Sequence, residues 1–186
     1  MKRDVSDVNI LNDFCTRFCS IIEKYTEYII VSGFVAISSG RVRGTEDIDM
    51  IIPKINYALF TKIHKRLSNK GFVAIQSADP KILFNDYLSK NVSVRYTWKD
   101  LPVPEMELKF SKDKLDEYQL KTKTKLPLTG LNIWFSSINM NIAFKEELLK
   151  SSKDLEDARH LRIVYSELVD EKEIKKIVSM IKRYRL

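Results

Sequence analysis

Hydrophobic and polar residues follow two different periods along the chain, and the changes of period mark the expected elements. From Asp7, a typical helix cap, apolar residues recur every three or four positions as far as Tyr25, which predicts an amphipathic helix. Short runs rich in β-branched residues are typical of strands, and they occur at 28–31, 46–52, 72–76, 93–98 and 106–110.

Helical spacing returns between these runs and fills the C-terminal third. A turn at 32–33 is expected to lead into a short helix that ends at Gly40, and a longer helix over 56–70 ends at Gly71. Residues 81–90 also have a helical pattern. Three C-terminal helices are expected, with caps at Ser136 or Ser137, at Ser151 or Ser152, and at Asp170.

The segment 121–135 is expected to form a β-hairpin. Lys121, Lys123 and Lys125 alternate with other residues and would share one face of its first strand. The pair Thr129-Gly130 would make the turn into the second strand.

The length of 186 residues and a hydrophobic content of 44% allow one buried core. We therefore expect an α+β protein with a mixed β-sheet core over 1–135, flanked by helices, and C-terminal helices over 136–186 that pack on it as one compact unit. Cys15 and Cys19 lie at helical spacing and are expected to pack as reduced thiols. No apolar run reaches the roughly 18 residues of a membrane span, so we expect a cytoplasmic protein without membrane contact.

The charge of the chain changes this picture by favouring anionic partners. Its 32 Lys and Arg residues outnumber 25 Asp and Glu residues, and the net charge is +7. An excess of positive charge favours nucleotides, tRNA or other nucleic acid as partners. A solvated surface with charges of both signs is the alternative interpretation.

Two aspartates, Asp47 and Asp49, stand one residue apart inside an isoleucine-rich strand. Side chains alternate between the two faces of a strand, so both carboxylates point to the same side and would repel each other if left bare. A divalent cation removes that repulsion, and Mg²⁺ prefers oxygen ligands that it shares with phosphate groups. A solvated strand end is the alternative, because Asp-x-Asp alone is a common pattern.

The residues before these aspartates favour a nucleotide site. Backbone N–H groups at Ser32 and Gly33 can hold phosphate oxygens. Arg41 and Arg43 can meet a triphosphate, and the Thr45 hydroxyl can fix the loop. An anion cradle, a guanidinium pair and a carboxylate pair therefore follow one another within a single strand, helix and strand unit.

The segment VSGFVAISSGRVRGTEDIDMII, residues 31–52, resembles the signature of the nucleotidyltransferase superfamily with the DNA polymerase beta fold. Its Gly-containing turn, Gly-x-x-Arg and Thr-x-Asp-x-Asp are most similar to the minimal prokaryotic branch, which includes abortive-infection and toxin–antitoxin types. The chain departs from the family at Ser32-Gly33, where Gly-Gly or Gly-Ser is usual, and a serine there restricts the backbone. The resemblance implies a nucleotidyltransferase-like mixed sheet with Ser32, Gly33, Arg41, Arg43 and Thr45 at the nucleotide.

The resemblance also implies a third carboxylate from a neighbouring strand. Glu105, Glu107 and Lys109 would share one strand face, and Glu107 is the candidate because it lies centrally between apolar residues. An exposed amphipathic strand is the alternative for Glu107. Asp47, Asp49 and Glu107 would then be the catalytic residues and would bind two Mg²⁺ ions, with Mn²⁺ as the alternative metal.

The resemblance extends to IAFKEELLKSSKDLEDARHL, residues 142–161. It implies that Lys145, Lys153, Asp154 and Asp157 face the nucleotide or order the site. The alternative is purely structural: Lys153 and Asp157 stand at i, i+4 spacing and Asp154 lies in a first helical turn, and both features stabilise a helix without any ligand.

The activity that the resemblance implies is transfer of a nucleoside monophosphate from an NTP such as ATP to a hydroxyl of an RNA such as tRNA, a protein or a small molecule. The acceptor hydroxyl would attack the α-phosphorus in line and pyrophosphate would leave. The alternative is a catalytically inactive module of the same fold that binds nucleotide, RNA or a partner protein, such as an antitoxin. Neither His64 nor His160 lies in a nucleophile motif, so no hydrolytic triad is expected.

Overall fold

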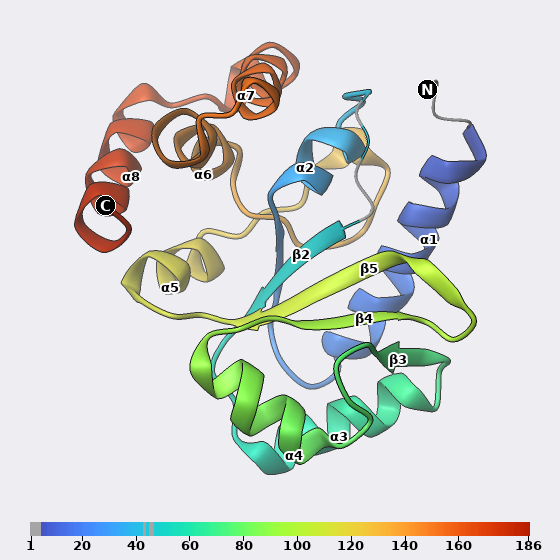
Figure 1. The fold of residues 1–186 in the computed structure, drawn as a ribbon. Coiled ribbons are helices and arrows are strands. Elements are labelled where there is room, and N and C mark those ends of the chain that lie inside the picture. Colours follow the sequence, from blue (N-terminus) through green and yellow to red (C-terminus); the bar gives the residue numbers. More distant parts are fainter. Residues whose placement is uncertain (1–4, 43, 45–46) are drawn as a thin grey trace.

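The computed structural model describes residues 5–42, 44 and 47–186. Its centre is a five-stranded mixed sheet (Figure 1) in which β2 and β5 run parallel and the other neighbouring strands run antiparallel. In sheet order the strands are β1 (Ile29–Val31), β2 (Asp47–Ile52), β5 (Leu101–Phe110), β4 (Val94–Trp98) and β3 (Phe72–Ala74). All five lie where the sequence predicts strands, and the α+β class is confirmed.

Helices occupy the predicted intervals between and after the strands, and two further ones, at 114–121 and 127–129, are not predicted. The first ones are α1 (Val5–Ile22), α2 (Gly33–Ser38), α3 (Tyr57–Ser68) and α4 (Pro80–Ile82), which η1 (Leu83–Tyr87) and η2 (Leu88–Lys90) continue. The later ones are α5 (Lys114–Lys121), η3 (Pro127–Thr129), α6 (Ile138–Ala143), η4 (Phe144–Leu149), α7 (Ser152–Val164), η5 (Ser166–Leu168) and α8 (Glu171–Tyr184). In the described part of the chain, none of these helices combines the length and apolar character that a bilayer crossing needs.

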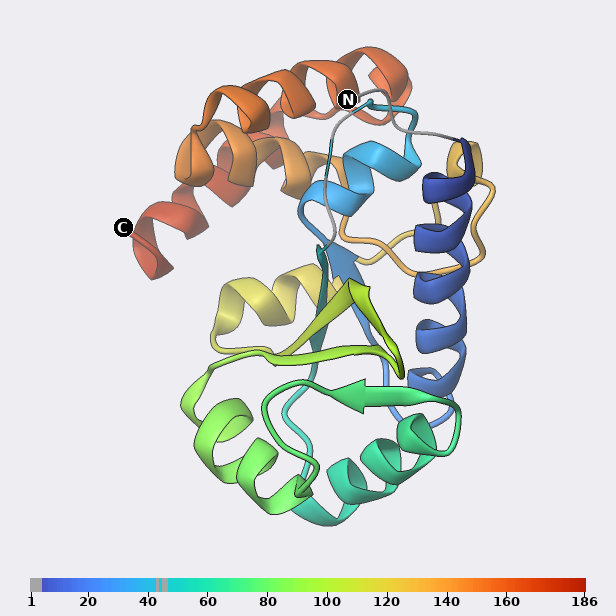
Figure 2. The same cartoon turned by 45° about the vertical axis from the view of Figure 1, so that its right-hand side comes forward.

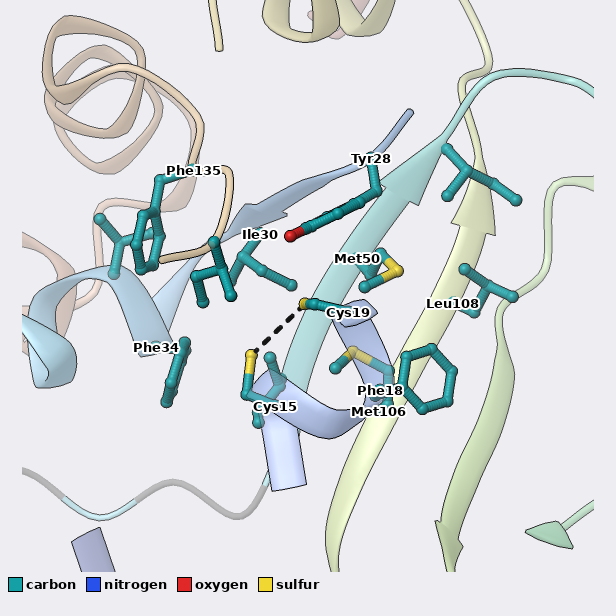
Figure 3. Packing of buried hydrophobic residues seen from close by; sticks show 14 of the residues in the cluster. Cys15, Phe18, Cys19, Tyr28, Ile30, Phe34, Met50, Met106, Leu108 and Phe135 are labelled. Carbon is teal, nitrogen blue, oxygen red and sulfur yellow. Dashed lines mark hydrogen bonds between the residues drawn. The ribbon is translucent and has the colours of Figure 1, made fainter. Parts of the chain in front are cut away.

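One face of the central strands is part of the main hydrophobic core. Figure 3 shows Met50 of β2 and Met106 and Leu108 of β5 beside α1, and all three side chains are buried. Cys15 and Cys19 of α1 are buried free thiols with their Sγ atoms 3.9 Å apart, and burial raises the pKa of Cys15, so this thiol stays protonated. Because side chains alternate along a strand, the acidic residues of β2 and β5 lie on the opposite face.

The segment predicted as a hairpin, 121–135, does not form a pair of strands. Its first residue ends α5, and a single antiparallel bridge joins Thr124 to Phe135. Pro127 opens a turn of 3₁₀ helix between them, and a proline has no N–H to donate to a ladder. The end of the segment instead lies along β1, where Ile30 donates to the Trp134 carbonyl and accepts from the Ser136 N–H.

The C-terminal helices α6, α7 and α8 pack against one another at one end of the molecule, and α3 and α4 lie at the other end (Figure 2). The predicted caps are confirmed for Ser137, Ser151 and Asp170, whose side chains accept from N–H groups of the following turn. Helix α7 contacts α2, and α8 contacts α5. The C-terminal helices thereby border the elements that flank β2, while a domain boundary after residue 135 stays a prediction.

The cap of α3 provides a local test of these assignments. The Asn56 side chain accepts a hydrogen bond from the Leu59 N–H at 2.9 Å. We expect Asn56→Ala to lower the free energy of unfolding by about 1 kcal/mol, because that N–H would lose its partner. Urea denaturation measures the change, with Lys65→Ala at an exposed position of the same helix as the control. Equal losses in the two variants would contradict a role of the cap.

Candidate active site

The parallel pairing of β2 and β5 aligns four carboxylates on one face of the sheet. Asp47 is in register with Glu105, and Asp49 is in register with Glu107. Within each strand the two acidic residues are one residue apart and therefore point to the same side. The structure thus brings Glu107 beside Asp49, as the sequence predicts, and adds Glu105 beside Asp47.

Basic side chains neutralise these carboxylates. The Lys109 Nζ lies 3.1 Å from an oxygen of Asp49. The Arg95 Nε lies 2.9 Å from an oxygen of Glu107, and its Nη1 lies 3.8 Å from Glu105. Because Asp49 and Glu107 are drawn to these cations, no group of three or more acidic, His or Cys side chains in the described residues is arranged to hold a metal ion as it stands.

The turn before α2 has an unusual backbone. Ser32 has φ +67° and ψ −139°, close to a region that is nearly reserved for glycine and costs a residue with a side chain about 1–3 kcal/mol. The departure from the family pattern therefore lies at the position where the backbone most needs glycine. Gly33 begins α2 and is buried.

Of the two arginines in the loop before β2, the structure describes Arg41 and not Arg43. Arg43 and Thr45 lie outside the described residues, so their predicted contacts with a nucleotide stay predictions. Arg41 is described, and it forms an ion pair with Glu156 of α7, while its Nε lies 3.5 Å from Asp157. Arg41 therefore attaches the end of α2 to α7.

Lys145 is the centre of a buried ionic cluster between η4 and α7. Its side chain is 1% exposed, and its Nζ donates to Asp157 at 2.9 Å and to Asp154 at 3.3 Å. The Asp157 side chain is completely buried. Lys153, by contrast, is exposed on the first turn of α7. The resemblance implies a role for Lys145, Lys153, Asp154 and Asp157. Lys145 forms ion pairs with both aspartates, and Lys153 is not part of this cluster.

A cavity of 440 Å³ lies next to Asp49, between the sheet, α5, α6 and η4. Ser32 of the turn and Lys145 of the buried cluster also line it, so the cavity connects three of the predicted groups. Its apolar wall includes Met140 and Phe144. A mostly apolar wall with a few charged groups is typical of a small-ligand site.

Sequence reasoning missed several charged residues of this cavity. Lys109 was visible as the third member of the Glu105 and Glu107 face, but its ion pair with Asp49 depends on strand pairing. Arg185 follows α8, and its Nη2 lies 2.7 Å from Asp116 of α5 while its Nη1 is paired with Asp113. Burial raises the pKa of Asp116 and lowers the pKa of Arg185, since each charge loses water.

The two histidines form hydrogen bonds away from the carboxylates. His64 is buried, contrary to the exposure typical of a helix surface, and its ring nitrogens bond the Tyr96 hydroxyl at 3.0 Å and the Ala78 carbonyl at 3.2 Å. Burial lowers the pKa of His64, which favours the neutral ring. The His160 Nε2 lies 3.0 Å from the carbonyl oxygen of Ser39, at the end of α2.

Comparison with known proteins is informative at the level of structure. No family model and no curated protein matches the chain. The chain is similar in structure to an antigenic nucleotidyltransferase-like protein from Paracoccidioides brasiliensis, with a TM-score of 0.56 and 16% identity. The match covers 99% of this chain and 91% of that protein's chain.

The antibiotic-resistance factor ANT(2'')-Ia is similar both in its solution structure and in its crystal structure with adenylyl-2''-tobramycin. Each comparison gives a TM-score of 0.53 and 14% identity over 97% of this chain, covering 94% and 99% of the respective structures. At these identities the likeness is one of fold. The chain has a nucleotidyltransferase-like α+β fold.

Proposed function

We propose that the protein transfers a nucleoside monophosphate from an NTP to an acceptor hydroxyl. The observation that carries the proposal is the register of β2 and β5, which aligns Asp47 with Glu105 and Asp49 with Glu107 next to the cavity. The fold that the chain shares with nucleotidyltransferase-like structures supports it.

Asp47, Asp49 and Glu107 would hold the metal in this proposal, as two Mg²⁺ ions or as Mn²⁺. Carboxylate oxygens on neighbouring strands are the donors that Mg²⁺ prefers, so the donor chemistry suits the ion. Binding would require Asp49 and Glu107 to exchange Lys109 and Arg95 for the ion. When bound, Mg²⁺ would neutralise the triphosphate and lower the pKa of the acceptor hydroxyl.

The protein's own side chains would bind and orient the substrates. Lys109 would exchange Asp49 for a phosphate oxygen, since both are anions within reach of a flexible ammonium group. Met140 and Phe144 would pack against the nucleobase. Lys145, held by Asp157, would keep η4 and α7 together behind the cavity.

The decisive experiment offers each α-labelled NTP with Mg²⁺ to separate pools of RNA, protein and small molecules. Transfer of label to one pool would support the proposal. The small-molecule pool includes an aminoglycoside, because the ANT(2'')-Ia structure contains adenylyl-2''-tobramycin. Retention of a partner protein on the purified chain would test the toxin–antitoxin role that the sequence resemblance implies.

A catalytically inactive binding module is the second candidate. The ion pairs of Asp49 with Lys109 and of Glu107 with Arg95 favour it, because they satisfy the carboxylates without metal. The strained Ser32 also favours it. NTP binding without transfer to any pool would support the module and would contradict the enzyme.

Competition between Lys109 and the metal leads to a measurable expectation. Lys109 is about one-third exposed, and a partly exposed ion pair contributes about 1 kcal/mol at most. Removing it by Lys109→Met is therefore expected to lower the half-saturating Mg²⁺ concentration about fivefold. The measurement is the rise of the unfolding temperature with Mg²⁺ in the absence of NTP.

The control for this titration is Lys114→Met, which removes an exposed lysine of α5. An unchanged Mg²⁺ midpoint in Lys109→Met would show that the ion pair and the metal do not compete for Asp49. An equal shift in Lys114→Met would show a general effect of net charge.

A further inference from the structure

A second hollow, of 560 Å³, adjoins the ends of the strands that carry the carboxylates. Pro53 and Lys54 follow β2 directly, Ser111 and Lys112 follow β5 directly, and all four line it. Helix α5, which lies beside this end of β5 in Figure 1, forms another wall. A ligand in this hollow would therefore lie at the end of β2 and β5 that is opposite to Asp47.

Lys112 lines both this hollow and the 440 Å³ cavity next to Asp49. Each volume alone is in the range of a single small-ligand site. A ligand that fills both must pass Lys112, and it must be longer than one nucleotide. The shared lysine makes the two volumes neighbours, and together they are called the path.

Positive charge predominates along this path. Asp49, Asp116, Glu27 and Glu117 are its four acidic residues. Its seven basic residues are Lys54, Lys109, Lys112, Lys121, Lys123, Lys145 and Arg185. Four of these basic residues are already in ion pairs, so the excess positive charge comes from the other three lysines, which face Glu117 alone among the remaining acidic residues. That excess attracts a polyanion and repels a polycation such as an aminoglycoside.

Three lysines of the path, Lys54, Lys112 and Lys121, are exposed and form no ion pair within the described residues. Burial and the nearby charges of Arg185 and Lys109 lower the pKa of Lys112, although Asp116 opposes the effect. Burial is the main cause of this shift, and an anion beside Lys112 would stabilise its charged form.

Lysines dominate the charged lining of the path. Six of the seven basic residues are lysines, whose ammonium groups bind phosphates as point charges. Beyond Lys123 lies the partly exposed Trp134, with the Lys123 Nζ 5.5 Å and the Lys125 Nζ 4.3 Å from the centre of its ring. These cation–π contacts hold two ammonium groups over the ring and place further positive charge at this end of the path.

We infer that the path from Lys112 to Lys121 and Lys123 binds the sugar-phosphate backbone of a single-stranded nucleic acid. The strand would lie in the outer hollow with its end at Lys112, at the border of the 440 Å³ cavity that would hold the NTP. The further role of this strand as the acceptor of the transferred nucleotide rests on the proposed function. Binding of the strand does not depend on nucleotide transfer.

The test is fluorescence anisotropy with a labelled RNA of about 12 nucleotides, a length that one binding fold covers, and with the DNA of the same sequence. The assay contains neither NTP nor Mg²⁺. We expect Lys54→Gln, Lys112→Gln and Lys121→Gln each to weaken RNA binding about threefold to fivefold. Each should also reduce the slope of log K against log salt by about 0.7, since one phosphate contact is lost.

The matched control is Lys175→Gln, which removes an exposed lysine of α8 that lines neither hollow. It should leave RNA affinity unchanged. An equal loss in Lys175→Gln, or no loss in the three path variants, would overturn the inference. So would an acidic peptide of the same charge that competes as well as RNA does. Tighter binding of RNA than of DNA, or the reverse, identifies which strand supplies the phosphates.

Failure of the two proposals would give different results. If labelled nucleotide is transferred to a small molecule but RNA does not bind, the path is overturned and the enzyme stands. If RNA binds with the expected loss in the path variants but no label is transferred, the path stands and the chain is a binding module.

Discussion

Replacing Asp49 by asparagine is expected to reduce nucleotide transfer about a thousandfold while the protein stays folded. The metal contributes several kcal/mol of transition-state stabilisation, and each 1.36 kcal/mol corresponds to about tenfold in rate. Asparagine keeps the shape of the side chain but loses the charge that holds the ion. The measurement is the initial rate of label transfer from the preferred α-labelled NTP at saturating Mg²⁺.

The control for Asp49→Asn is Asp86→Asn, whose carboxylate is exposed, is paired with Lys90 and lines neither hollow. It should keep the wild-type rate. Because Asp49 is paired with a partly exposed Lys109, its loss should change the unfolding temperature little. Transfer at the wild-type rate by Asp49→Asn would contradict the assignment of the β2 carboxylates to catalysis.

Replacing Lys145 by methionine is expected to give the largest loss of stability among the substitutions considered. Lys145 and Asp157 are both buried, and removal of one partner leaves the other as a charge without its main counter-ion. Breaking such a pair costs about 3–5 kcal/mol. For a chain of this length that corresponds to a fall of roughly 10 °C in the unfolding temperature. Urea and thermal denaturation measure both quantities.

A second substitution separates the ion pair from simple packing. Lys145→Met combined with Asp157→Leu should recover part of the lost stability, because the fully buried carboxylate is then removed as well, and the remaining Asp154 is partly exposed and still bonded to Ser151. Lys153→Met, at an exposed position on α7, is the matched control and should change the free energy of unfolding by less than about 0.5 kcal/mol. A double variant less stable than Lys145→Met would contradict this account.

The sequence predicts the strands well because each has a clear local pattern. It does not predict which strands are neighbours, since pairing depends on contacts distant in the chain. The parallel register of β2 with β5 is such a contact, and it adds Glu105 to the carboxylates beside Glu107. The predicted hairpin fails for a local reason: Lys121 belongs to a helix capped by Asp113, and the cap lies outside the alternating segment.

The candidate site is predictable only where its residues are close in sequence. Asp47 and Asp49 are on one strand, so their shared face follows from the period of the strand. The burial of Lys145 depends on η4 packing against α7, and Arg185 follows the last helix. Charged residues that are brought together by helix packing leave no pattern in a single sequence.

The backbone at Ser32 limits which residues evolution can place there. A glycine would adopt φ +67° without cost, and asparagine tolerates positive φ better than most residues. Valine or isoleucine would add the strain of a branched Cβ to the same torsion angles. Homologues that keep this turn should therefore have one of very few residue types at position 32, even where the hydroxyl has no role.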